Sequence, residues 1–337
     1  MKDGHLGRYL WTDAFGVLNF ITLFKETKQP HFLALATILV ETVHDILGRT
    51  RDLSTRLSGA SDQSPLSGGL RIGKNEASGA DGDGQYHHYL TLWMFALNRL
   101  SIATGEMDYN DQAVSLAKAI HPAFVYQRDA LHPRVVWYAN GCAVENMMDS
   151  DQCCRKMSVD LSHFQSRGEG NLDPMNGLFT YRILQQTHGD SRVLQDEVDD
   201  YQRIVDQKWK AYTSSDTLDL GMALWAAHWY SDQEEWSKGL ANAALRDMRI
   251  VFHETHYLDV PIAQRLAFRE FGTCLGIGVY PTHDLQPVAG QIIAAWKEAG
   301  RVPIPARNAE LESLEPIDLV MYAAATCPGA FQKDYLN

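Results

Sequence analysis

The residues best suited to chemistry lie in the segment DGDGQYHHYL, residues 81–90. Two aspartates and two adjacent histidines stand among glycines, directly ahead of an aromatic-rich helical stretch. A carboxylate near a helix start is favoured by the helix dipole, and histidine exchanges protons near neutral pH. The segment predicts general acid/base chemistry, with Asp83, His87 and His88 as candidate catalytic residues. The alternative for Asp83 is a helix cap, because aspartate is a preferred capping residue.

Adjacent helical residues point about 100° apart. One of His87 and His88 is therefore expected to face a cavity while the other packs between helices. A metal site is disfavoured because a defined ligand spacing is missing. The sequence HETHY places His253 and His256 three residues apart, whereas the zinc-protease motif needs histidines four apart. We therefore expect no metal and no other cofactor.

Asp13 is a second candidate acid, because it follows Trp11 at the start of another helical segment. An aromatic ring beside a carboxylate suits a sugar, since the ring stacks and the carboxylate binds hydroxyls. Asn171 and Asp173 occupy a comparable position in GEGNLDP. Both aspartates have capping as their structural alternative, and the proline after Asp173 makes that position a strong helix start.

Other side chains could contact a substrate. Arg71 and Lys74 lie among glycines in GGLRIGK, which suits recognition of a carboxylate or phosphate, or pairing with the acidic surface. Arg269 shares a helix face with Arg265 and has the same two alternatives. The remaining candidate substrate-binding residues are Gln85, Tyr86, Trp93, Trp137 and Asp219, with Trp225 as a further stacking tryptophan.

Helical periodicity dominates the elements that must position these residues, since apolar residues recur every three or four positions. Strands are scarce, with short candidates at residues 135–138 and 250–252. The Gly- and Ser-rich residues 50–85 predict a long ordered loop, because loops of this length in compact domains are usually functional. Helices are expected at residues 13–25, 31–48, 86–104, 109–120, 174–188, 191–210, 219–230, 233–250, 265–279, 285–299 and 316–325.

These helices form pairs in which the first member is more apolar and the second more amphipathic. A helix that is apolar on most sides is buried on most sides. The pattern predicts an all-α fold, an (α/α)6 toroid with the first helices as an inner ring, in a single domain of residues 1–337. A straight helical solenoid is the competing architecture, but closure into a ring better explains first helices without a solvent face.

The stretch WMFALNRLSIATGEMDYNDQAVSLAKAI, residues 93–120, resembles a hairpin of the six-hairpin glycosidase-like superfamily. It has an aromatic helix, a Thr-Gly-acid turn and an Ala-rich second helix. The resemblance implies a pocket at one end of the toroid, formed by inner-helix ends and their loops. The superfamily includes glycoside hydrolases and N-acylglucosamine 2-epimerases. We therefore expect an enzyme that acts on a carbohydrate or another polyhydroxylated small molecule.

A hydrolase would divide acid and base roles between two carboxylates, Asp83 with Asp13 or Asp173. An epimerase or isomerase would move a proton with His87 or His88. Two other functions stay open because the chain has no complete catalytic signature. One is a natural-product cyclase or isomerase with an aromatic cavity, and the other is a non-catalytic binding protein.

The formal net charge of -12, without a basic cluster, argues against nucleic acid or an anionic membrane as a partner. No window approaches 18 consecutive apolar residues, which argues against a membrane-spanning helix. The first residues lack the apolar core of a signal peptide. The few cysteines, odd in number, predict free thiols in a reducing compartment. We expect a cytoplasmic protein with a small-molecule substrate, and the sequence does not specify its oligomeric state.

Overall fold

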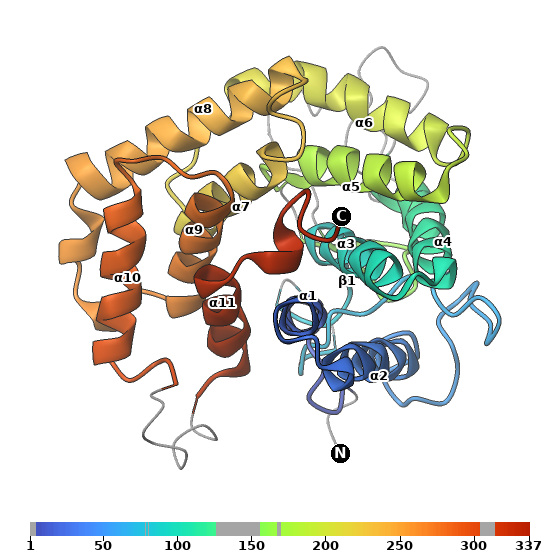
Figure 1. Cartoon of the computed structure of the whole chain (residues 1–337). Helices are drawn as coiled ribbons and strands as arrows, with labels where there is room; N and C mark the ends of the chain where they lie inside the picture. The colour runs from blue at the N-terminus through green and yellow to red at the C-terminus, as the bar shows by residue number, and fades with distance from the viewer. Residues whose placement is uncertain (1–4, 78, 80, 126–155, 167–169, 304–313) are drawn as a thin grey trace. The chain divides into compact units, whose positions relative to one another are not determined.

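The computed structural model describes residues 5–77, 79, 81–125, 156–166, 170–303 and 314–337. These residues form eleven α-helices and one small sheet (Figure 1). The all-α fold expected from the sequence is confirmed. Among the described helices, none is both long enough and apolar enough to cross a membrane.

Every helix expected from the apolar periodicity is present, with bounds shifted by about one turn or less. The helices are α1 Leu10–Thr27, α2 Pro30–Ile46, α3 His87–Thr104, α4 Met107–Phe124, α5 Asp173–His188, α6 Gln195–Lys208, α7 Thr217–Ala227, α8 Glu235–Arg249, α9 Ala267–Val279, α10 Gln286–Glu298 and α11 Pro316–Thr326. Three strands, β1 Gln85–Tyr86, β2 Lys156–Met157 and β3 Phe164–Ser166, form an antiparallel sheet in that order.

Helix boundaries follow local signals in the sequence. Asp216 caps α7, because its side chain accepts hydrogen bonds from the backbone N–H groups of Leu218 and Asp219. Both α3 and α5 end at a glycine in the left-handed conformation, Gly105 and Gly189. Such signals lie within a few residues of the boundary they set, so the sequence predicts them well.

The short strand predicted at residues 250–252 is wrong. The chain continues α8 as a π-helical turn, Ile250–Glu254, in which the Thr255 N–H donates to the Ile250 carbonyl at 2.9 Å. Val251 and Phe252 are buried by this turn. The β-branched run resembled a strand, but continuity with α8 outweighs that weak local preference. The strand predicted at residues 135–138 lies outside the described residues.

The chain divides into two compact units. The first contains Met1–Val17 and Pro30–Gln207, and the second contains Leu18–Gln29 and Lys208–Asn337. In the first unit, α3 packs against α2, α4 and α5. In the second, α7 packs against α8 and α9, and α9 also packs against α10 and α11. The first helices α3 and α5 are thus neighbours in the first unit and α7 and α9 in the second, while a closed ring of all pairs stays a prediction.

The first helices of the pairs are buried on most sides, as their apolar composition predicts. Residues 90–101 of α3 are all buried. In the second unit, α7 and α9 approach backbone to backbone, because a Cβ atom on Gly221 would lie 2.0 Å from the Gly272 carbonyl oxygen. Only glycine permits that approach.

Candidate functional site

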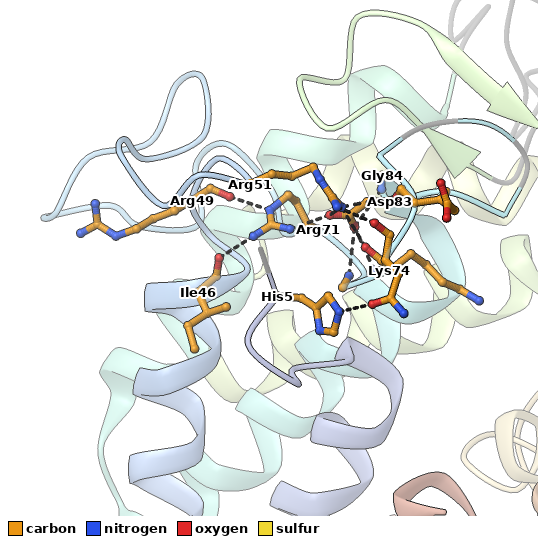
Figure 2. Close-up of polar contacts among 12 residues, drawn as sticks. His5, Ile46, Arg49, Arg51, Arg71, Lys74, Asp83 and Gly84 are labelled. Carbon is orange, nitrogen blue, oxygen red and sulfur yellow. Dashed lines mark hydrogen bonds and ion pairs between the residues drawn. The ribbon is translucent and has the colours of Figure 1, made fainter. Parts of the chain in front are cut away.

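The long loop before α3 is ordered around Asp83, which is fully buried (Figure 2). Its Oδ2 accepts hydrogen bonds from Arg71 Nη1 at 2.5 Å and from Arg51 Nη1 at 2.9 Å. Its Oδ1 accepts the backbone N–H groups of Gly73 at 3.0 Å and Gly84 at 3.1 Å. We call Arg51, Arg71 and Asp83 the Asp83 ion cluster. The carboxylate is fully occupied by protein donors.

Arg71 is equally buried and equally occupied. Besides Asp83, its guanidinium donates to the Arg49 carbonyl at 2.6 Å and to the Ile46 carbonyl at 2.8 Å (Figure 2). A buried charge is stable only when it is paired and hydrogen-bonded. These contacts tie the loop to the end of α2. They do not fit the predicted role of Arg71 in substrate binding, and they favour a structural role for Asp83.

The loop segment directly after Arg71 joins the two chain segments that begin α1 and α3. The Ile72 carbonyl accepts the Leu10 N–H at 3.0 Å, and the Ile72 N–H donates to the Gly84 carbonyl at 2.8 Å. Gly73 has φ +86°, and a Cβ atom there would lie 2.2 Å from the Arg8 carbonyl oxygen. Only glycine fits this approach. The loop therefore fixes both helix starts beside each other.

Aromatic side chains from these two helix starts gather beside the loop. The indole of Trp11 stacks on the His88 ring, with centroids 4.8 Å apart and planes at 28°. The hydroxyls of Tyr9 and Tyr89 lie 2.5 Å apart. Trp11 is buried and the other rings are half-buried. We call this group the aromatic cluster; its members are Tyr9, Trp11, Tyr86, His88 and Tyr89.

Asp13 lies on the first turn of α1 beside this cluster and is 6% exposed. Its Oδ2 accepts the Tyr9 N–H at 3.1 Å, and its Oδ1 lies 3.1 Å from Arg8 Nη1. Burial raises the pKa of Asp13 to about 6, because these two contacts compensate only part of the lost hydration. The carboxyl group therefore exchanges its proton close to neutral pH.

Two further polar side chains adjoin the aromatic cluster. The Lys74 ammonium lies 5.6 Å from the centroid of the Tyr9 ring, in a cation–π contact. Asn176, on the first turn of α5, places Nδ2 2.7 Å from Nδ1 of His88. Among the described residues, neither the amide oxygen of Asn176 nor the indole N–H of Trp11 has a hydrogen-bond partner.

His87 points in a different direction from His88, as the angle of about 100° between adjacent helical residues predicts. It is fully buried, with Nε2 2.6 Å from the Tyr201 hydroxyl and Nδ1 3.6 Å from Asp173 Oδ1. Burial raises the pKa of Asp173, but the hydrogen bond and charge of His87 outweigh it and hold that pKa below its usual value. Both residues are buried, and Asp173 also interacts electrostatically with His88.

Two more predicted substrate contacts do not fit their positions, because Gln85 and Trp93 are fully buried. The Gln85 side chain donates to the Gly68 and Val159 carbonyls at 2.8 Å each and so stabilises the loop. The Trp93 indole donates to Nε2 of His44 at 3.1 Å, and burial lowers the pKa of that histidine to about 3. Gln85 thus has a structural role in the loop, and Trp93 has one in the core of the first unit.

Other candidates belong to the second unit. Asp219 accepts a hydrogen bond from the Tyr212 hydroxyl at 2.9 Å. Arg269 is paired with Asp216, the capping residue of α7. Both side chains therefore have partners within their own unit, and the structure supplies no substrate role for them.

Three candidates remain. Trp225 is buried in the second unit, where its indole donates to the Phe331 carbonyl at 3.1 Å. Asn171 is exposed in the turn before α5. Trp137 lies outside the described residues. Of all the predicted site residues, the structure brings Trp11, Asp13, Lys74, Tyr86 and His88 together.

The sequence interpretation missed three residues of this site: Tyr9, Tyr89 and Asn176. Tyr89 directly follows His88, and Tyr9 stands two residues before Trp11, so the helix starts themselves were the available signal. Asn176 was detectable as a polar residue in the first turn of a largely apolar first helix. Its partner His88 is 88 residues away, which no local pattern reveals.

No protein-family model, curated protein or solved structure matches this chain. Within the described part of the chain, no group of three or more His, Cys, Asp or Glu side chains could hold a metal ion. The functional proposal therefore rests on the chemistry of the aromatic cluster and its polar neighbours.

Proposed function

We propose that the aromatic cluster and Asp13 form the active site of an enzyme that acts on a carbohydrate or another polyhydroxylated small molecule by general acid/base catalysis. The observation that carries the proposal is Asp13, a buried carboxyl group with a pKa of about 6 that accepts the Tyr9 N–H on the first turn of the helix that carries Trp11. A general acid or base works best when its pKa lies near the working pH. Ordinary exposed aspartates are fully ionised there.

The rings beside Asp13 support a polyhydroxylated substrate. Tryptophan and tyrosine present flat apolar faces for the C–H faces of a sugar, and the tyrosine hydroxyls can bond to its hydroxyl groups. Lys74 adds a cation next to Tyr9 that could hold an anionic substituent. The site is thus suited to a small ligand with both apolar and hydroxylated faces.

Proton transfer by Asp13 and His88 is the reaction type that the contacts favour. A glycoside hydrolase needs two carboxylates that face the substrate. Asp83 is fully occupied by arginine and backbone donors, and Asp173 is buried beside His87. An epimerase or isomerase needs groups that take and return a proton, which a carboxyl group and an imidazole supply. We therefore place an epimerase or isomerase ahead of a hydrolase.

We further propose that the hairpins close into an (α/α)6 toroid of the six-hairpin glycosidase-like type. The neighbouring first helices, α3 with α5 and α7 with α9, support this arrangement within each unit. The aromatic cluster lies at the N-terminal ends of two first helices, α1 and α3, where the proposed architecture has its pocket.

The test is a screen of monosaccharides, amino sugars and sugar acids in D2O, with deuterium exchange and product formation followed by NMR. Asp13→Asn should lower kcat by about 10²- to 10⁴-fold, the usual contribution of one general acid or base. Asp81→Asn is the matched control, because Asp81 is exposed in the loop before α3. The proposal would be contradicted if no compound of the screen bound or reacted, or if Asp13→Asn kept full activity. Binding of aromatic metabolites instead would favour a cyclase.

A further inference from the structure

Asn176 makes a single side-chain hydrogen bond among the described residues, the one to His88. The side chain is 1% exposed, and its Oδ1 has no partner there. Contact with His88 is therefore the interaction that selects between the two orientations of the amide group.

A carboxamide offers opposite groups to its partner in its two orientations. With Nδ2 toward the ring, the amide donates to an unprotonated Nδ1, and neutral His88 carries its proton on Nε2. After a half-turn, Oδ1 accepts the N–H that Nδ1 carries in the imidazolium ion. The half-turn breaks no other hydrogen bond of Asn176 among the described residues, because Oδ1 has none.

We infer that Asn176 is a positioning residue whose amide turns over, so that it hydrogen-bonds His88 in both the neutral and the protonated state. The inference rests on the proposed function, in which His88 transfers a proton. A ring that keeps this bond in both states gains and loses its proton without leaving its stacked position on Trp11. An aspartate or a leucine at position 176 would lack this property, since each serves at most one state.

Other titratable groups surround His88 and are the same in every variant at position 176. Asp173 interacts electrostatically with His88, and the Tyr86 ring centroid lies 6.4 Å from that of His88. A change in the titration of His88 on substitution therefore reports the amide itself. Among the described residues, the titratable groups at the near ends of the elements around His88 are Tyr9 and Asp13 at the start of α1, Tyr86, His87 and Tyr89 at the start of α3, and Asp173 on the first turn of α5.

The experiment follows the imidazole ¹⁵N and ¹³C resonances of His88 through a pH titration, assigned with His88→Gln. The wild type should carry the Nε2–H tautomer when neutral. Asn176→Asp should switch it to the Nδ1–H tautomer and raise the titration midpoint by about one pH unit or more, because a carboxylate only accepts. Asn176→Leu should leave the midpoint within about half a unit, since both states lose an equivalent bond.

The same neutral tautomer in the wild type and in Asn176→Asp would overturn the inference. A shift of more than about half a unit in the His88 midpoint of Asn176→Leu would also overturn it. An upward shift would mean that the amide only donates to neutral His88, and a downward shift would mean that it only accepts from the imidazolium ion. His163, which is exposed, is the internal control and should titrate identically in all variants. If Asn176→Leu does not fold, the tautomer in Asn176→Asp decides alone.

These measurements need no substrate, so the two proposals fail separately. A screen without any ligand would refute the proposed enzyme and leave the amide turnover standing. An unchanged tautomer would refute the role of Asn176 and leave the assignment of Asp13 standing.

Discussion

Asp83 and Asp13 are both buried carboxyl groups with arginine neighbours, yet their surroundings differ in one decisive way. Asp83 accepts hydrogen bonds from two arginines at Oδ2 and from backbone N–H groups at Oδ1. Asp13 has one backbone donor and one half-exposed arginine, Arg8. The donors around Asp13 are too few to compensate its burial, which raises the pKa of this carboxyl group to about 6.

The difference distinguishes a structural carboxyl group, Asp83, from a candidate reactive one, Asp13. A fully hydrogen-bonded ion cluster has no lone pair left for a substrate and is costly to disturb. A carboxyl group with few donors keeps an exchangeable proton. The Asp83 ion cluster therefore fixes the helix starts, and Asp13 is available to react at one of them. Each variant below disturbs one side of this comparison.

The largest effect is expected from Asp83→Asn. The amide cannot neutralise Arg71, so the variant should lose about 3–5 kcal/mol of unfolding free energy, the usual cost of leaving a buried charge unpaired. Urea denaturation followed by circular dichroism measures this loss. Asp81→Asn, at an exposed position, should change stability by less than about 0.5 kcal/mol. Equal stabilities for the two variants would remove the structural role of Asp83.

Asp13→Asn should change how stability depends on pH. The pKa of Asp13 is about 6 in the folded protein and 3.8 as a model value, so the folded state holds the proton more tightly. Between these two pH values the unfolded chain binds fewer protons than the folded protein. The free energy of unfolding therefore falls as the pH rises, by up to about 3 kcal/mol in total. The variant lacks this loss, so its stability relative to the wild type should improve from pH 4 to pH 7. Parallel curves would show that Asp13 titrates normally.

A smaller effect is expected from Tyr9→Phe, which removes the hydroxyl pair within the aromatic cluster while the Asp83 ion cluster stays intact. One neutral hydrogen bond contributes about 1 kcal/mol. Tyr89→Phe should cost a similar amount, and the double variant should cost little more than either single one. Full additivity in this double-mutant cycle would show that the two hydroxyls are independent.

The helices were predictable because their signals are local: a period of 3.6 residues, capping residues and terminal glycines. The position of Trp11 and Asp13 at the start of α1 was predictable for the same reason, since both stand on its first turn. The role of Asp83 was not, because Arg71 and Arg51 are 12 and 32 residues away and the loop that joins them has no periodicity. Side-chain burial depends on tertiary packing, and it decides which candidates can meet a ligand.

The most direct test is an NMR titration of the Asp13 side-chain carboxyl carbon, assigned by comparison with Asp13→Asn. The account predicts a midpoint of about 6, the value to which burial raises the pKa of this group. A midpoint at the ordinary aspartate value near 3.8 would contradict it. In that case Asp13 would be ionised throughout the neutral range, and the contrast with Asp83 would no longer separate a reactive carboxyl group from a structural one.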